Sequence, residues 1–178
     1  MERLYTDASF SSRSKIGGMA VVAPEWSAAY GGGQWRSIWD IRVAREVNYG
    51  AAVFCAACNC RDSMDAEKRA LGLAFLLAYD MITLHEAAGF SGVKVEIITD
   101  SLVNINFITF GNAGRDPIMR NLCELWQSHR IILSKVKAHA GNWGNELADK
   151  WSKHSRRTSE QFMQAQLLGG IDHAHAFL

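Results

Sequence analysis

The segment from residue 65 to residue 88 is the feature of the sequence that most restricts the fold. It starts near residues that can cap a helix, Ser63 or Asp65, and it stops before Gly89, a residue type that often ends helices. Its apolar residues cover more than one face of the predicted helix, so the helix must be buried. The sequence therefore predicts a long core helix with other elements packed around it.

Strand-like segments lie on both sides of this helix. The predicted strands cover residues 3–6, 17–22, 51–57, 93–99 and 131–137. Further helices are predicted over 101–110, from Pro117 after an Asp116 cap, and from an Asn142 cap to about Ser155. N-terminal strands followed by alternating helix and strand predict an α/β fold, with one mixed sheet and helices packed on it.

Residues 24–48 interrupt this pattern. Three consecutive glycines at 31–33 and scattered tryptophans predict an irregular excursion, with one strand near residues 35–41. The chain of 178 residues contains no internal repeat and no recognisable linker. We therefore expect a single domain.

The basic residues are unevenly distributed along the chain. The net charge is +1, with 19 Lys and Arg against 18 Asp and Glu. Between residues 130 and 157, seven basic residues accompany only two acids, so this segment carries +5 and the remainder −4. Such a segment is typical of a surface that binds polyanions, although a solvated helix face has the same composition.

The sequence predicts neither a membrane span nor a secretion signal. No run reaches the ~18 consecutive apolar residues of a spanning helix, and the N-terminus lacks an apolar signal core. We expect a soluble intracellular protein, in the cytoplasm or, in a eukaryotic cell, in the nucleus.

Three of the four cysteines, Cys55, Cys58 and Cys60, lie close together, and Cys123 is distant. This spacing does not resemble a disulfide framework. It would supply three soft ligands to zinc. In a strand, however, Cys55 and Cys58 would point to opposite faces, which favours buried apolar cysteines over a zinc site.

Four acids occur at the predicted ends or first turns of elements. Asp7 and Asp100 each follow a predicted strand, Glu67 lies in the first turn of the long helix, and Asp149 lies on the last helix. If the two strands are neighbours, Asp7 and Asp100 lie side by side and repel each other unless a cation lies between them. Oxygen ligands of this kind suit Mg²⁺ or Mn²⁺. Each acid alone is more typical of a turn, a cap or a solvated helix face.

Four motifs together resemble type 1 ribonuclease H. They are Leu4–Ser9 followed by Gly17–Val22, Ala66–Ala78, Ile98–Ser101, and Val136–Asp149. The last motif fits the family pattern H-x-G-x-x-G-N-E-x-A-D at every fixed position. The motifs occur in the family order from residue 4 to about residue 155, which is nearly the whole chain.

This resemblance implies a ribonuclease H-like fold over residues 1–157, with a five-stranded mixed sheet and helices on both faces. Residues 158–178 would form a partly flexible C-terminal extension. The implied activity is hydrolysis of the RNA strand of RNA/DNA hybrids with two Mg²⁺ ions, which Mn²⁺ could replace. The implied catalytic residues are His139, which would assist proton transfer or product release, and four metal-binding acids: Asp7, Glu67, Asp100 and Asp149.

The resemblance also implies a binding surface for the hybrid, which is the expected partner. We expect no membrane partner and favour a monomer. The residues expected to contact the substrate are Ser9, Ser63, Ser101, Lys137 and Asn145.

The sequence departs from the family pattern in several places. Asp7 and Glu67 are 60 residues apart, longer than usual, so residues 24–48 look like an insertion. Asp100 and His139 are only 39 residues apart, too close for the basic handle helix of many cellular members. Leu102 stands where many members have a glutamine that contacts RNA. These departures affect the expected strength of hybrid binding more than they affect catalysis.

Two alternatives remain open. The chain could be a catalytically inactive, nucleic-acid-binding domain of this fold, because a fold does not guarantee an activity. The presence of all four acids argues against this, since without metal they contribute only repulsion. The chain could also be the ribonuclease H part of a retroelement polyprotein, because the missing handle is compatible with that origin.

Overall fold

The computed structural model describes residues 1–24, 41–46, 50–110, 116–126, 130–137 and 140–167. Its strands are β1 (Glu2–Phe10), β2 (Ile16–Ala23), β3 (Arg42–Glu46), β4 (Ala51–Asn59), β5 (Val95–Thr99) and β6 (Ile131–Lys135). Its helices are α1 (Ser63–Ala87), α2 (Leu102–Thr109), α3 (Pro117–Trp126) and α4 (Trp143–Leu167). The predicted α/β class is confirmed.

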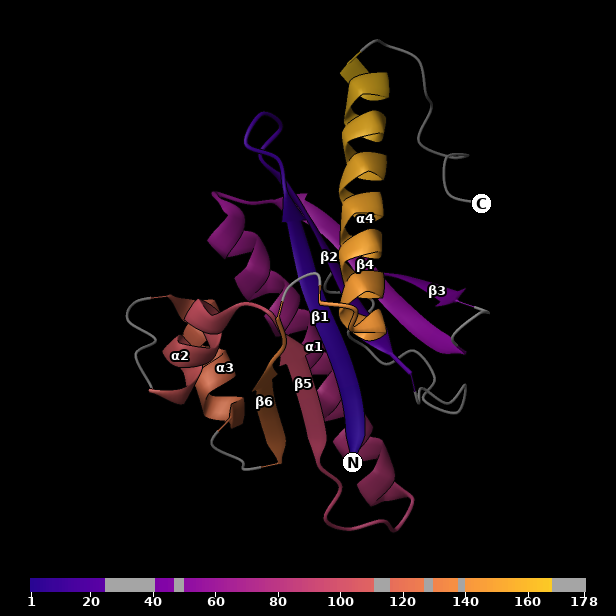
Figure 1. The fold of residues 1–178 in the computed structure, drawn as a ribbon, viewed down its shortest axis with the longest axis vertical. Helices are drawn as coiled ribbons and strands as arrows, with labels where there is room; N and C mark the ends of the chain where they lie inside the picture. Colours follow the sequence, from indigo (N-terminus) through magenta and orange to yellow (C-terminus); the bar gives the residue numbers. More distant parts are fainter. Residues whose placement is uncertain (25–40, 47–49, 111–115, 127–129, 138–139, 168–178) are drawn as a thin grey trace.

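The sheet has six strands in the order β3-β4-β2-β1-β5-β6 (Figure 1). The pairs β1–β2, β2–β4 and β3–β4 are antiparallel, whereas β1–β5 and β5–β6 are parallel. The expected count of five strands was wrong, because β3 adds an edge strand beside β4. The strand expected near residues 35–41 lies almost wholly outside the described residues, and β3 begins just after it.

Helices cover both faces of the sheet. Alternate side chains of a strand point to opposite faces. Leu4 accordingly belongs to the large core cluster that contains the buried face of α1, while its neighbour Tyr5 packs with Leu147 and Ala148 of α4. Figure 1 shows α4 crossing in front of the sheet and α1 behind it. Helices α2 and α3 contact α1 and β6, and they add Ile108, Met119 and Leu122 to the large cluster.

The long helix α1 is the centre of the larger core. Its buried side chains include Leu71, Phe75 and Met81. The cap is neither of the two expected residues: Asp62 caps the helix, and its Oδ1 accepts a hydrogen bond of 2.8 Å from the Asp65 amide. By length and composition, α1 is apolar enough to cross a membrane. The core helix of a soluble protein has the same properties, and α1 packs against β1, β2 and β5.

The last helix is longer than expected. The Asn142 side chain accepts a hydrogen bond from the Asn145 amide at its start, as predicted, but α4 continues beyond Ser155 to Leu167. Part of the expected C-terminal extension is thus regular helix, and residues 168–178 lie outside the described residues. α4 approaches β2 very closely, since a Cβ at Gly18 would lie 2.1 Å from the Ser152 carbonyl oxygen.

Candidate functional site

The register of two parallel strands brings Asp7 and Asp100 together. Tyr5 of β1 pairs with Ile98 of β5, so two further residues along each strand place Asp7 beside Asp100. The sequence predicted that Asp7 follows the end of its strand, and this was wrong. Strand β1 continues to Phe10 because it pairs with β2. Asp7 lies just beyond the last residue of β1 that pairs with β5. The expected juxtaposition therefore holds for a different local reason.

Helix α1 adds Glu67 to this pair. Carboxylate oxygens of Asp7, Glu67 and Asp100 all lie within 4.8 Å of one another. Glu67 lies in the second turn of α1 and not in the first as expected, because the helix begins at Ser63, two residues before Asp65. Buried Thr6 fixes this part of the helix against the strand, since its hydroxyl donates a hydrogen bond of 3.1 Å to the Ala70 carbonyl.

The electrostatics of the cluster are unfavourable for three free carboxylates. Burial raises the pKa of Asp7 to about 7, with the charge of Asp100 as the next largest cause. Burial also raises the pKa of Glu67 to about 9, followed by the charges of Asp7 and Asp100. The Ala8 amide opposes both shifts, and it donates a hydrogen bond of 2.8 Å to Asp7. A cation between the carboxylates would remove the repulsion.

The fourth predicted acid lies near the cluster without joining it. Asp149 of α4 contributes to the raised pKa of Asp7, but its oxygens are outside the group of atoms within 4.8 Å of one another. Its carboxylate instead accepts a hydrogen bond of 2.7 Å from the Lys153 ammonium, one turn later on α4. Lys153 therefore neutralises Asp149, and its charge also opposes the rise in the pKa of Asp7.

The donor set fits a hard divalent cation. Three carboxylates supply only oxygen atoms, which are the ligands that Mg²⁺ and Mn²⁺ prefer. The raised pKa values of Asp7 and Glu67 mean that the folded protein holds these acids in their charged form only at a cost. Metal binding would offset that cost. Among the described residues, this is the group of acids, histidines and cysteines whose ligand atoms meet in this way.

The residues expected to contact the substrate differ in their surroundings. Ser101 follows Asp100 directly, and its hydroxyl accepts a hydrogen bond of 2.9 Å from the Asn104 side chain. Asn145 is 3% exposed, and its side-chain oxygen has no hydrogen-bond partner. Lys137 is exposed. His139 lies outside the described residues, so its predicted place near the acids stays a prediction.

Two other expected contacts have different surroundings. Ser9 accepts a hydrogen bond of 2.9 Å from Arg156 of α4, so its hydroxyl is engaged within the protein. Ser63 is the first residue of α1 and is exposed. Arg156 also makes two 2.9 Å contacts with Glu160. The positive segment on α4 is therefore partly compensated by its own acids, and exposed Arg157 is a freer cation than Arg156 or Lys153.

Sequence reasoning missed Thr6, Lys153 and Asn104 as supports of the site. Thr6 could have been identified from the sequence. It directly precedes a candidate acid in a strand, so its side chain points to the opposite face of the sheet, where it contacts α1. Lys153 follows Asp149 by four residues, the spacing that brings side chains together on a helix. Asn104 gave no such signal, since its burial depends on how α2 packs.

The cysteines follow the expected alternation. Cys58 packs against the large hydrophobic core on the α1 face of the sheet. Cys55 lies an even number of residues from Val53 along β4, so it points to the α4 face, where Val53 packs. A single ion therefore could not use all three thiols without rearrangement of the strand.

No protein-family model and no curated protein matches this sequence.

Proposed function

We propose that this protein is an endonuclease that hydrolyses the RNA strand of RNA/DNA hybrids. The observation that carries the proposal is the meeting of Asp7, Glu67 and Asp100 within 4.8 Å, with Asp149 nearby. These are the four acids that the family motifs single out. They come from segments spread over most of the chain, so their proximity depends on the whole fold.

The sheet supports a ribonuclease H-like fold. Five strands were expected from the resemblance, and β4, β2, β1, β5 and β6 provide five adjacent strands with helices on both faces. The additional strand β3 lies at the edge, within the segment that resembles an insertion. The insertion therefore leaves the other five strands contiguous.

The acids would act mainly by holding and positioning cations. Two bound Mg²⁺ ions would supply a water activated for attack on an RNA phosphate and would stabilise the leaving 3′ oxygen. Asp7, Glu67 and Asp100 would provide the ligands common to the site, with Asp149 completing it. When Asp149 binds a cation, the Lys153 ammonium could leave the Asp149 carboxylate and contact a substrate phosphate instead.

Contacts near the cluster would orient the hybrid. Ser101 lies next to Asp100, and the hydrogen bond from Asn104 leaves the Ser101 hydroxyl proton free to reach a backbone oxygen. Lys137 is exposed, as a phosphate contact must be. Discrimination of RNA from DNA would then depend on contacts to the 2′-hydroxyl groups.

The test is cleavage of hybrids labelled on one strand at a time. We expect cleavage of the RNA strand with Mg²⁺ or Mn²⁺, none with a chelator, and no cleavage of duplex DNA. Asp100→Asn should abolish cleavage. The matched control is Glu86→Gln, because Glu86 is an exposed acid on α1, roughly 28 Å along the helix from Glu67. Tight hybrid binding without cleavage would instead support the inactive nucleic-acid-binding domain.

His139 is proposed to move protons rather than to hold metal. Its replacement by alanine should reduce turnover by roughly 10²-fold while leaving measurable, metal-dependent cleavage. Complete inactivity of a folded His139→Ala protein would contradict this role.

A further inference from the structure

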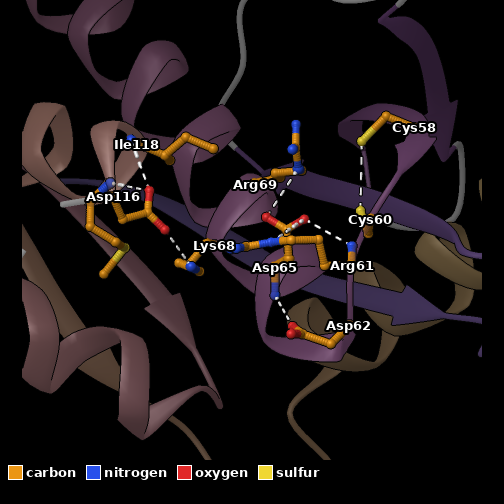
Figure 2. A network of polar contacts seen from close by, with 10 residues as sticks. Cys58, Cys60, Arg61, Asp62, Asp65, Lys68, Arg69, Asp116 and Ile118 are labelled. Carbon is orange, nitrogen blue, oxygen red and sulfur yellow. Dashed lines mark hydrogen bonds and ion pairs between the residues drawn. The ribbon is translucent and has the colours of Figure 1, made fainter. Parts of the chain in front are cut away.

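A second group of chemically active side chains lies where β4 leads into α1. Cys58 is near the end of β4, and Cys60 follows the strand. Their Sγ atoms are 3.7 Å apart. Figure 2 shows the two side chains joined by a dashed line. Cys58 is half-buried, whereas Cys60 is only 4% exposed. No role in the proposed cleavage uses either thiol.

We propose that Cys58 and Cys60 form a reversible redox site, in which oxidation by a hydroperoxide joins the two Sγ atoms in a disulfide. Cys58 is the attacking thiol, because it is the more accessible of the two. Cys60 is the resolving thiol. This site is independent of the proposed nuclease activity.

The surroundings favour a thiolate on Cys58. The hydrogen bond between the two sulfur atoms is the largest cause of a lowered Cys58 pKa, and the positive charge of Arg69 contributes further. Arg69 is held in place by an ion pair with Asp65, with its Nε 3.3 Å from Oδ1. The same hydrogen bond and burial raise the pKa of Cys60, so the pair shares one proton that stays on the buried sulfur. Thiolates rather than thiols react with peroxides.

The backbone next to the pair makes room for the Cys60 sulfur atom. A Cβ at Gly17 of β2 would lie 2.5 Å from the Cys60 Sγ, so only glycine leaves space for this thiol. Two residues along a strand are about 6.5 Å apart. This lies at the upper end of the Cα separations of roughly 4.4–6.8 Å that disulfides bridge. Cys60 lies just beyond the end of β4, and bond formation must bring the two Sγ atoms from 3.7 Å to about 2.05 Å. The resulting disulfide is strained, so a mild thiol should reduce it.

The chemistry balances in two steps. The Cys58 thiolate attacks one oxygen of hydrogen peroxide, which breaks the O–O bond, leaves a sulfenic acid and releases hydroxide. The Cys60 sulfur then attacks the Cys58 sulfur, expels the sulfenic oxygen as water and forms the S–S bond. Two thiols are oxidised, and one peroxide is reduced.

Cys55 and Cys123 provide internal controls. Cys55 is buried on the opposite face of β4, and burial raises its pKa. Cys123 is also buried, and burial raises its pKa as well. Neither should react under conditions that oxidise Cys58.

The experiment counts free thiols in the intact chain after treatment with stoichiometric hydrogen peroxide. The protein is unfolded in iodoacetamide and analysed by peptide mass spectrometry. We expect the number of alkylated cysteines to fall from four to two, with a bond between positions 58 and 60, and dithiothreitol should restore all four. Four remaining free thiols would overturn the proposal, as would a bond that includes Cys55.

Variants separate the roles of the two cysteines. In Cys60→Ser, Cys58 should retain a sulfenic acid that dimedone traps, while Cys55→Ser should still form the disulfide. Arg69→Gln should slow alkylation of Cys58 severalfold. Arg61→Gln is the matched control, because Arg61 contacts the same Asp65 but is not among the groups that shift the Cys58 pKa. Equal slowing by both arginine variants would overturn the role of Arg69. The thiol count is made on the unsubstituted chain. The main test therefore stands even if one of the variants fails to fold.

Discussion

Asp65 and Glu67 lie two residues apart on α1, but their carboxylates have opposite surroundings. Asp65 is 3% exposed and accepts hydrogen bonds from the Arg61 amide at 3.0 Å and the Arg69 guanidinium at 3.3 Å (Figure 2). Glu67 faces Asp7 and Asp100 instead. A buried acid with a structural role receives its counter-charge from the chain. A buried acid grouped with other acids leaves the counter-charge to be supplied by a ligand.

Cleavage activity should separate the two acids most strongly. Glu67→Gln should reduce hybrid cleavage by roughly 10³-fold or more, because it removes a ligand of the proposed metal site. Asp65→Asn should retain activity within about threefold for the fraction that is folded. Steady-state cleavage at saturating Mg²⁺ measures both. Equal losses in the two variants would remove the distinction between a structural and a functional acid.

Stability should change in the reverse order. Asp65→Asn should lower the free energy of unfolding by about 2 kcal/mol, since it leaves the Arg69 charge without its partner and weakens the start of α1. Glu67→Gln should leave the metal-free protein equally stable or more stable, because it removes repulsion. Urea denaturation with a chelator present measures this difference. A large loss of stability in Glu67→Gln would mark Glu67 as structural.

The pH dependence of stability sharpens the comparison. Unfolded carboxyl groups lose their protons near pH 4, whereas folded Asp7 keeps its proton to about 7 and folded Glu67 to about 9. The folded chain binds more protons in this range, so the free energy of unfolding of the metal-free protein falls as pH rises from about 4 to about 9. Each group contributes up to about 1.4 kcal/mol per pH unit.

This slope is measured by denaturation at a series of pH values without metal. Glu67→Gln should show a shallower fall than the natural sequence, and Mg²⁺ should restore stability at the high-pH end. Parallel curves for the two proteins would contradict the assigned pKa of Glu67.

The smallest expected effect concerns substrate affinity. Replacing Lys137 and Arg157 together by alanine should raise KM about threefold with little change in kcat, and it should flatten the salt dependence. Both residues are exposed. Lys94→Ala is the matched control, because Lys94 precedes β5 and therefore lies at the opposite end of the strand from Asp100. An equal rise in KM for the control would place the binding surface elsewhere.

Local sequence patterns predicted much of the scaffold and the meeting of three acids. The alternation of strands and helices, the Asp116 cap and the long core helix all follow from capping and apolar periodicity. The motif order was sufficient to anticipate that Asp7, Glu67 and Asp100 converge. The position of His139 stays a prediction.

Long-range pairing explains what the sequence did not predict. β3 has the sequence Arg-Val-Ala-Arg-Glu, which lacks the alternation of apolar and polar residues that marks a strand, and its strand structure goes with its pairing to β4. The extension of β1 beyond Asp7 depends in the same way on pairing with β2. The end of α4 has no strong apolar period, but contacts such as Ser14 with Glu160 hold it to the β1–β2 hairpin.

The close approach of α4 to β2 has a consequence for how the site could evolve or be redesigned. Any side chain at position 18 would displace the Ser152 backbone by about an ångström or more. A helix moves as a nearly rigid rod, so Asp149, one turn earlier, would move away with it. The distance between the fourth acid and the other three is therefore set by a residue that touches none of them. Variation at Gly18 would alter the geometry of the site through α4, without changing a single ligand.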